Sequence, residues 1–528
     1  MMNETSSGKQ TRRWLVLLLG LIVVGLVVVL LWPEQRPSAT PPSSLAAMPA
    51  PSVAVVHFNQ ATADLTQLTT LWQTFAAATA DFDPPLDTPL QTLPQHLAAL
   101  NISLAADVRP WLGQTVSLSL LSWGDATTTA AWVLAADSVD EAAADGFVDK
   151  VNAGEWSAVR SDNLVLIGSS ETAVQQALTT LSGESIATDA VYQEAIASLP
   201  ADHPFTIFVP GERVPSLVEQ VWASTSLSNT IPLPQLLPSD GLQSLALALT
   251  PTATGLQIDS TRLYAPAAPA VWLAEPQTHH LAPANTLAYL AVGGLDRLWA
   301  SYLQTLSTNP DQADALEAIA LLGDQFGLDP NRDLFPLLDG ETAVILTPSR
   351  SGPAAQLLRL NLGGTLVAST SDPDTLAANL AGFTTAISNP QLGVATVAAT
   401  AVNDIPLTQI ETSLLPGISF VYGVGHEALL LSTSAESVGE LSGVNGRSLA
   451  DAPDYQAAQT AIGQPPMLFI KVNELVEVFG SSAFMLAQAQ EFTRETAVLQ
   501  PLHILAASSS VSQNMVQNKV ILVIEANE

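Results

Sequence analysis

The sequence predicts an α+β protein in which one N-terminal transmembrane helix precedes two similar halves, each with a largely antiparallel sheet covered by helices. Three observations predict this. An uncharged apolar run lies near the N-terminus, the same signals recur in the same order in two parts of the chain, and the expected strands come in adjacent pairs. Strict alternation of strand and helix, which is typical of doubly wound parallel sheets, is missing.

The apolar run extends from Trp14 to Trp32 and contains no charged residue. At about 1.5 Å per helical residue it spans roughly 28 Å, close to the hydrocarbon thickness of a bilayer. The flanking basic cluster of Lys9, Arg12 and Arg13 precedes the run. Because Lys and Arg stay on the cytoplasmic side, residues 1–13 are predicted inside and the C-terminal part outside the plasma membrane.

A cleaved signal peptide is the alternative reading of this run. Such peptides have an apolar core of about 7–15 residues followed by a small-residue cleavage site. The core here is longer, and Trp32-Pro33-Glu34 follows it, so an uncleaved single-pass anchor is favoured. Residues 33–51 hold six prolines among Ser, Thr and Ala, which predicts an extended stalk of up to roughly 60 Å.

Charge and composition limit the classes of function. The chain has 528 residues, which predicts two or three domains. Beyond residue 13 it holds 14 basic residues (17 less 3) and 48 acidic residues (49 less 1), a net charge of −34. Such a surface repels phosphate backbones, so no nucleic-acid partner is expected. The chain has no cysteine, which excludes disulfides, thiolate nucleophiles and sites that need Cys ligands.

The part that follows the stalk reads as a duplicated unit. We expect a first α+β repeat over residues 52–264, an Ala/Pro-rich junction over 265–283 and a second repeat over 284–528. Each repeat opens with an apolar strand and closes with two long strands. The matched signals are 53–58 with 286–292, 107–116 with 333–344, 164–171 with 429–436, 189–192 with 451–455, 204–209 with 466–471, and 241–263 with 501–526.

Three matched positions are predicted to be structural, because a catalytic centre is rarely needed twice in one chain. The matches are Pro110 with Pro336, Glu171 with Glu436, and Tyr192 with Tyr455. Glu at the start of a helix favours the positive end of its dipole. The tyrosines are expected to anchor equivalent short helices by burying their rings and bonding their hydroxyl groups.

The layout resembles an uncharacterised bacterial family of membrane-anchored proteins, known only as a domain of unknown function. The resemblance rests on residues 283–289, on residues 327–333, and on Gly340-Glu341. It implies a duplicated extracytoplasmic α+β unit behind one membrane helix. It brings no established activity or site residue.

Candidate chemistry is weak throughout. The segment from Asp329 to Asp333 places oxygens at positions 1, 3 and 5 of a calcium loop, but the required Gly and Glu are replaced by Leu334 and Gly340, and Glu341 comes one residue too late. A polar turn that caps a helix is the preferred reading. The seven histidines show no metal-binding spacing; they are His57, His96, His203, His279, His280, His426 and His503.

No catalytic motif is found either. Gly-x-Ser-x-Gly and Ser-x-x-Lys signatures and Gly-rich phosphate loops are missing. Eight tryptophans outside the membrane run are assigned to the core rather than to a ligand groove; they are Trp72, Trp111, Trp123, Trp132, Trp156, Trp222, Trp272 and Trp299. No catalytic, cofactor-binding or metal-binding residue is therefore assigned, and no cofactor is expected.

The sequence thus favours a non-enzymatic envelope protein that acts as a binding or scaffold module. Its partners are the membrane, through the N-terminal helix, and as a candidate another envelope protein. One alternative is an extracytoplasmic hydrolase with a site built from dispersed carboxylates. Another is a carrier of an apolar ligand, which needs an apolar cavity between sheet and helices.

Overall fold

The computed structural model describes residues 44–59, 102–122, 130–200, 203–223, 241–265, 276–308, 326–389, 395–412, 419–441, 446–481 and 501–524, with single positions 67, 70, 74, 321, 323 and 499. The predicted cytoplasmic segment 1–13, the transmembrane helix 14–32 and residues 33–43 lie outside these ranges. Among the helices that are described, none combines the length and the apolar character needed to cross a bilayer.

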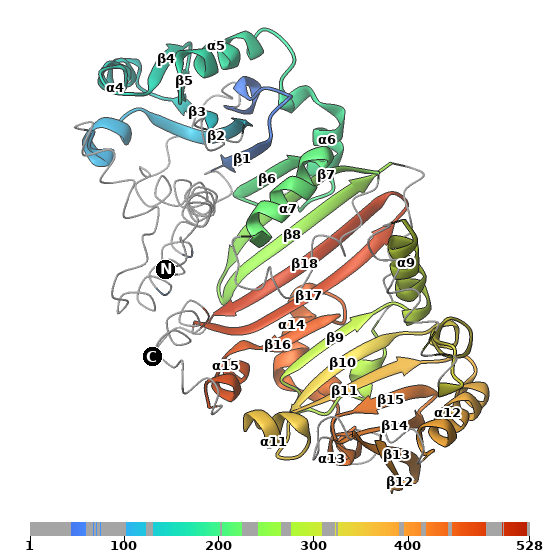
Figure 1. The fold of residues 1–528 in the computed structure, drawn as a ribbon. Coiled ribbons are helices and arrows are strands. Elements are labelled where there is room, and N and C mark those ends of the chain that lie inside the picture. Colours follow the sequence, from blue (N-terminus) through green and yellow to red (C-terminus); the bar gives the residue numbers. More distant parts are fainter. Residues whose placement is uncertain are drawn as a thin grey trace, which may run out of the picture. The chain divides into compact units, whose positions relative to one another are not determined.

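The chain forms two compact units. Unit 1 contains residues 1–271 and 510–519, and unit 2 contains residues 272–509 and 520–528. Each unit has an antiparallel sheet with helices packed against it, so the predicted α+β class is confirmed (Figure 1).

The sheet of unit 1 has the order β4-β5-β3-β2-β1-β6-β7-β8, with antiparallel neighbours throughout. The strands are β1 (Ala54–Asn59), β2 (Leu112–Ser122), β3 (Ala131–Ser138), β4 (Ser157–Ser161), β5 (Leu164–Gly168), β6 (Phe205–Pro210), β7 (Leu242–Thr252) and β8 (Gly255–Tyr264).

Side-chain caps fix the starts of the unit 1 helices. Asp140, Ser170 and Asp189 accept hydrogen bonds from backbone N–H groups in the first turns of α4, α5 and α6, which satisfies donors that have no partner inside the helix. The helices are α4 (Glu141–Asn152), α5 (Glu171–Thr180), α6 (Ala190–Ala197) and α7 (Val214–Ala223), with the short turns η1 (Ser44–Ala47), η3 (Leu104–Val108), η4 (Ile186–Thr188) and η5 (Gly211–Arg213).

The sheet of unit 2 repeats this order and adds one hairpin at its edge. It runs β12-β13-β14-β15-β11-β10-β9-β16-β17-β18. The strands are β9 (Ala288–Val292), β10 (Thr342–Pro348), β11 (Leu362–Ser369), β12 (Ala395–Val402), β13 (Ile405–Thr412), β14 (Ser419–Gly425), β15 (Ala428–Ser432), β16 (Leu468–Lys471), β17 (Leu502–Ser512) and β18 (Met515–Ile524).

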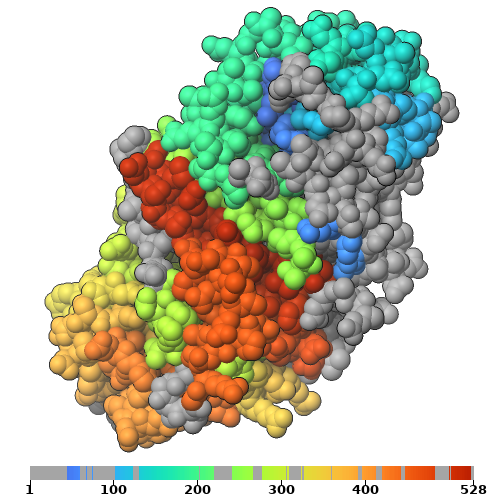
Figure 2. Space-filling view, turned by 180° about the vertical axis from the view of Figure 1, so that it is seen from behind, coloured from blue at the N-terminus to red at the C-terminus, as the bar shows by residue number. Residues whose placement is uncertain are grey.

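The helices of unit 2 are α9 (Leu295–Thr308), α11 (Pro353–Leu358), α12 (Pro373–Ile387), α13 (Ala435–Gly439), α14 (Pro453–Ile462) and α15 (Val472–Gly480), with η7 (Thr278–His280), η9 (Pro330–Leu334), η10 (Phe335–Leu337) and η11 (Leu449–Asp451). Residues of η11 and α14 join the main core of this unit. Figure 2 shows this orange part of the chain at the surface seen from behind.

The predicted duplication is confirmed at the level of single contacts. Two isolated β-bridges, Pro49 with Ser185 and Pro283 with Ser448, hold the opening segment of each unit in the same way. Ser52 then donates its hydroxyl hydrogen to the carbonyl of Pro49, and Thr286 donates equivalently to Pro283 at 2.6 Å. The two π-helical turns η3 and η9 are also equivalent, because each is closed by an aspartate, three residues before Pro110 and Pro336.

The repeats begin earlier than predicted, which corrects two boundaries. Residues 44–51 do not form part of an extended stalk, because Ser44, Ala47 and Met48 are fully buried in unit 1. Residues 276–283 are likewise folded into unit 2, where Ala282 joins the main core. The stretch 510–519 belongs to unit 1, where the N–H of Tyr264 donates to the carbonyl of Asn514 at 2.8 Å. The predicted second repeat, 284–528, had assigned residues 510–519 to the second unit.

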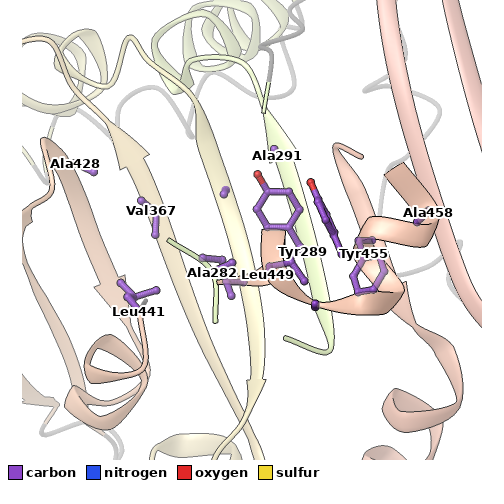
Figure 3. Packing of buried hydrophobic residues seen from close by; sticks show 14 of the residues in the cluster. Ala282, Tyr289, Ala291, Val367, Ala428, Leu441, Leu449, Tyr455 and Ala458 are labelled. Carbon is purple, nitrogen blue, oxygen red and sulfur yellow. The ribbon is translucent and has the colours of Figure 1, made fainter. Parts of the chain in front are cut away.

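The matched tyrosines occupy equivalent positions. Tyr192 meets Phe208 edge to face at 5.0 Å between ring centroids, and Tyr455 meets Phe469 in the same way at 5.4 Å. Figure 3 shows Tyr455 next to Tyr289 among the small side chains of the unit 2 core. The glutamates do not match: Glu171 directly follows the N-cap of α5, whereas Glu436 lies one position further into α13.

Candidate functional site

A buried carboxylate in unit 2 ties the opening turn to the sheet. Glu341 lies just before β10 and accepts hydrogen bonds from the N–H groups of Gln277 and Thr278, at 2.5 and 3.1 Å. Its other oxygen accepts from the hydroxyl groups of Thr278 and Tyr289, at 2.5 and 3.0 Å. All of its contacts are donors, so the carboxylate is held as a structural acceptor. Burial, and then the charge of Glu341, raise the pKa of Tyr289, which keeps that phenol protonated.

Unit 1 has the same connection with different residues. Ser44 opens η1, and its N–H and hydroxyl contact the hydroxyl of Thr115 at 3.3 and 2.9 Å. Thr115 in turn donates its hydroxyl and its N–H to Asp137 at 2.7 and 3.1 Å. Burial raises the pKa of Asp137 to about 6, although the bonds from Thr115 oppose this. Both units join their opening turn to the sheet through such hydrogen bonds. This repetition favours a structural role for the buried carboxylates.

Buried hydroxyl groups extend this unit 1 cluster to a histidine. Ser44 Oγ lies 2.7 Å from Ser117 Oγ, which lies 2.9 Å from His57 Nδ1. Burial, and then the neighbouring His203, lower the pKa of His57 to about 4. A serine, a histidine and a carboxylate therefore share one cluster, as a hydrolase requires, but His57 does not contact Asp137 and both serines are fully buried. A nucleophile needs access to substrate, and this arrangement lacks it.

The segment that resembles a calcium loop and the adjacent histidines His279 and His280 make structural contacts. Asp329 caps its own turn through Asn331 N–H at 2.9 Å, and Asp333 accepts from Asp329 N–H at 3.0 Å, so the preferred capping interpretation is correct. His279 stacks on Tyr455 with 5.5 Å between ring centroids and is tilted against His280 at 4.0 Å. Within the described ranges, no three His, Asp or Glu side chains come together in a way that suits a metal ion. His96 lies outside these ranges.

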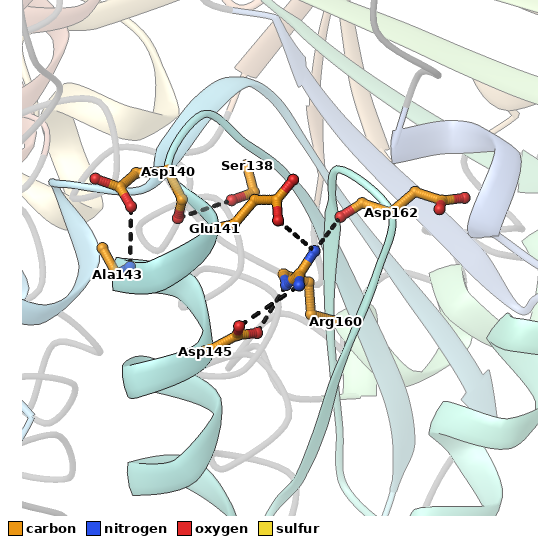
Figure 4. A network of polar contacts seen from close by, with 7 residues as sticks. All are labelled: Ser138, Asp140, Glu141, Ala143, Asp145, Arg160 and Asp162. Atoms are coloured by element: carbon orange, nitrogen blue, oxygen red, sulfur yellow. Dashed lines mark hydrogen bonds and ion pairs between the residues drawn. The ribbon is translucent and has the colours of Figure 1, made fainter.

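A charged cluster on α4 ties that helix to the neighbouring hairpin (Figure 4). Arg160 on β4 donates to Asp145 at 2.7 Å and to the carbonyl of Asp162 at 2.9 Å. It also lies 3.6 Å from Glu141. The neighbours of the Arg160 guanidinium are all carboxylates or a carbonyl group. Because the cluster is exposed to solvent, its ion pairs stabilise the contact between α4 and the hairpin only modestly.

Of the tryptophans that are described with their side chains, one lies in the core and three are half-exposed. Trp111 is fully buried and its Nε1 donates to the carbonyl of Asp107 at 2.8 Å. Trp132 and Trp156 meet edge to face at 5.4 Å, and Trp299 stacks on Phe335 at 4.0 Å. The side chains of Trp72, Trp123, Trp222 and Trp272 lie outside the described part.

A row of apolar side chains crosses the sheet of unit 2 on the face opposite its main core. Residues directly opposite each other on neighbouring strands are Leu468, Leu290, Val344, Leu366 and Leu431, from β16 to β15. We call these five residues the open row. Leu290, Val344 and Leu431 are 41%, 39% and 43% exposed. Of the described helices, Figure 1 shows α9 and α12 to one side of β9, β10 and β11.

The open row differs sharply from its counterpart in unit 1. There, Leu118 and Ile167 hold the places of Val344 and Leu431, and they are only 7% and 9% exposed. The core cluster around Phe147 of α4 covers that end of the face. In unit 2 the equivalent helix, α12, packs on Tyr422, the residue that follows Leu431 across the sheet. The cluster around this helix also includes Ala368 and Leu429 on the same face, with Leu366 half-buried against it. The helix therefore covers the β15 end of the face and leaves Leu290, Val344 and Leu431 exposed.

The lining of this face is uniformly uncharged. Its positions on β9, β10, β11 and β15 carry Ala, Leu, Val, Gly, a single Pro and a single Thr, in a chain whose charged residues are overwhelmingly acidic. The strands concerned are paired on both sides, so their backbone groups are satisfied. Its one polar side chain, Thr342, is buried, so the exposed part of the face offers a partner dispersion and desolvation.

Comparison with known proteins gives a family and no function. The model of a family described as "Protein of unknown function (DUF3352)" matches residues 14–156 and 149–524. No curated protein matches the chain. Three crystal forms of a protein called TP0453 are similar over part of the chain. Form III is 10% identical and forms I and IV are 7% identical, and they cover 44%, 44% and 43% of this chain and 84%, 82% and 81% of TP0453. Their TM-scores of 0.24, 0.24 and 0.25 are too low to support any inference.

Proposed function

Since the chain belongs to the DUF3352 family of proteins of unknown function, we propose its function from its own geometry: it is a membrane-tethered, non-enzymatic binding protein whose second unit receives an apolar group on the open row. The tether is the apolar run 14–32, and the basic residues before it support an extracytoplasmic location for both units. The location is the plasma membrane, facing the cell envelope.

One observation carries the binding role. Val344 and Leu431 are exposed, whereas the equivalent Leu118 and Ile167 are buried. The same two positions of the repeated sheet are therefore buried in unit 1 and exposed in unit 2. Exposed apolar side chains that are aligned on adjacent strands lower the solubility of a protein. Where they form a contiguous patch, they mark an interaction site.

The described residues favour this proposal over a hydrolase. Both oxygens of Glu341 accept from donors of its own unit, and Asp137 accepts from Thr115 through one oxygen, while its other oxygen is buried without a hydrogen-bond partner. An enzyme instead needs ionisable groups that converge on a site open to substrate.

A single introduced thiol tests the proposal, because the chain has no cysteine of its own. Val344→Cys places a thiol at the centre of the open row, and Val139→Cys places one at a site of similar exposure, 43%, away from the row. The full-length chain is reconstituted in vesicles and treated with a charged thiol reagent. Nile red, a neutral apolar probe, should slow the reaction at position 344 and leave that at position 139 unchanged. Equal rates at both sites with and without the probe would disprove binding at the row.

A further inference from the structure

We propose that the ligand of the open row is a single acyl chain carried by an uncharged or zwitterionic head group, lying across β16, β9, β10, β11 and β15. This inference rests on the proposed function and specifies its ligand. The argument has three steps: the chemistry of the lining, its shape and the charge around it.

The chemistry of the open row suits a hydrocarbon chain better than a protein surface. All five members are Leu or Val. Protein interfaces concentrate their binding energy in Tyr, Trp and Arg and surround it with hydrogen bonds. A polypeptide laid on this face finds no polar side chain of the row with which to pair its own polar groups. A methylene chain brings no such groups, so its transfer from water has no unsatisfied polar cost.

The shape is that of one extended chain. At about 4.8 Å between strands, the four steps from Leu468 to Leu431 span roughly 19 Å. Along the strands, the next positions on this face are small or less exposed: Ala288 precedes Leu290 by two residues and Gly364 precedes Leu366 by two. At the β15 end the row meets Tyr422, which is buried with Phe383 of α12. The exposed apolar surface is therefore long in one direction and narrow in the other.

Charge selects the head group. The part of the chain beyond residue 13 carries a net charge of −34, so it repels a fatty acid anion at low ionic strength. Zwitterionic and uncharged head groups meet no such penalty. The lipid class that fits is a monoacyl lipid with a neutral net charge.

The experiment measures protection of the Val344→Cys thiol in the full-length chain by lysophosphatidylcholine, added below its micellar concentration. Octanoyl, lauroyl and palmitoyl forms are compared, with Val139→Cys as the control. The expected result is affinity that rises by up to about fifteenfold for each added pair of methylene groups, because each methylene contributes up to about 0.8 kcal/mol when buried. The rise should level off once the chain spans the row. Palmitate should bind more weakly than the palmitoyl lysolipid, with the difference shrinking as salt is added.

Variants locate the site. A Leu290→Cys reporter combined with Val344→Asp should lose palmitoyl-lysolipid protection at least tenfold, because a charge then lies under the chain. The same reporter with Val511→Asp, which changes an exposed valine outside the row, should keep it. Unchanged melting of both variants shows that the fold survives, since both positions are exposed.

The outcomes separate the two proposals. Protection by Nile red without protection by any lysolipid would overturn the acyl-chain ligand and leave the apolar site standing. Protection without chain-length dependence would also overturn it. Protection in vesicles before any ligand is added would assign the row to the bilayer itself, against a single bound lipid. Absence of protection by every probe would remove both proposals.

Discussion

Thr115 and Glu341 occupy the same position of the repeated sheet, and each is the residue that holds the opening turn of its unit. Leu120 pairs with Ala54 and Leu346 with Ala288, so the two residues lie equally far before equivalent pairs. In unit 1 the neutral Thr115 contacts the opening turn and donates a hydrogen bond to Asp137. In unit 2 the carboxylate of Glu341 accepts a hydrogen bond from the opening turn directly. One connection has been built twice with different chemistry.

Replacing Glu341 with Gln should therefore destabilise unit 2 by about 2–4 kcal/mol, because an amide presents a donor where the site supplies only donors. The loss should exceed that of Tyr289→Phe, which removes a single hydroxyl, at about 1 kcal/mol. Urea unfolding of the full chain, with the two transitions fitted separately, measures both. If Glu341→Gln unfolded at the same urea concentration as the wild type, the carboxylate would not hold the turn. A ligand-binding role for Glu341 would then become the better explanation.

Tyr455 should act as a structural anchor. Its side chain is fully buried and its hydroxyl donates to the carbonyl of Pro466 at 3.1 Å. Tyr455→Ala should cost about 3 kcal/mol or more, as large-to-small core changes do. Tyr455→Phe keeps the ring and should cost about 1 kcal/mol. Calorimetry of the two variants gives the comparison, with Tyr192→Ala as the matched change in unit 1. A lysolipid affinity that fell while melting stayed unchanged would contradict the structural role.

The order of signals along the chain was enough to predict the duplication, because helix caps and strand pairs are local. The tyrosines matched for this reason. Glu171 and Glu436 did not match. A one-residue shift in an Ala- and Leu-rich stretch does not alter the visible apolar pattern, although it changes which residues of the two repeats are equivalent. The folded segment 44–51 was also missed, since Pro and Ser there look like linker until Met48 is seen to be buried.

The two features of the candidate sites depend on distant contacts. From the sequence, Glu341 carried part of the family resemblance and was a misplaced calcium ligand, but its role in holding the opening turn was not predicted, because its partner Thr278 lies 63 residues earlier. The open row lies on strands such as 288–292 that are apolar on both faces, which is typical of strands buried on both sides. Whether a helix covers the second face depends on where α12 packs, and periodicity does not encode that.

Acid should weaken unit 2 through His279. Its side chain is buried, and burial followed by the neighbouring His280 lowers its pKa to about 4. Below its usual pKa of about 6.5 the unfolded chain takes up a proton that the folded unit refuses. Stability is therefore complete above about pH 6.5 and declines as the pH falls towards 4, by up to about 3 kcal/mol.

The measurement is urea unfolding of unit 2 between pH 7 and 4. His279→Phe keeps an aromatic ring against Tyr455 and should remove this part of the slope. In unit 1 the raised pKa of Asp137 acts in the opposite sense to the lowered pKa of His57, so its slope should be flatter. An unchanged slope in His279→Phe would assign the acid sensitivity to another group.

Topology follows from Lys9, Arg12 and Arg13 lying before the apolar run. A protease added outside intact, wall-stripped cells should degrade both units if they lie on the extracytoplasmic side, as we propose. Immunoblots with antibodies against each unit report the cleavage. A cytoplasmic marker protein should stay intact as the control for lysis. Full protection of the two units would contradict the predicted orientation.

The start of the folded region gives the sharpest test of the corrected boundary. A chain that begins at residue 44 keeps Ala47 and Met48, which are fully buried in the unit 1 core, and the hydrogen bond from Ile186 N–H to the Met48 carbonyl at 2.9 Å. A chain that begins at residue 52 loses all of these and leaves a cavity, which should cost unit 1 about 3–5 kcal/mol. Unit 2 has its own opening segment at 276–283, so its unfolding transition should be the same in both chains. Urea unfolding monitored by hydrogen exchange in β1 and in β9 separates the two units. If the chain from residue 52 kept unit 1 as stable as the chain from residue 44, residues 44–51 would be the end of a stalk after all.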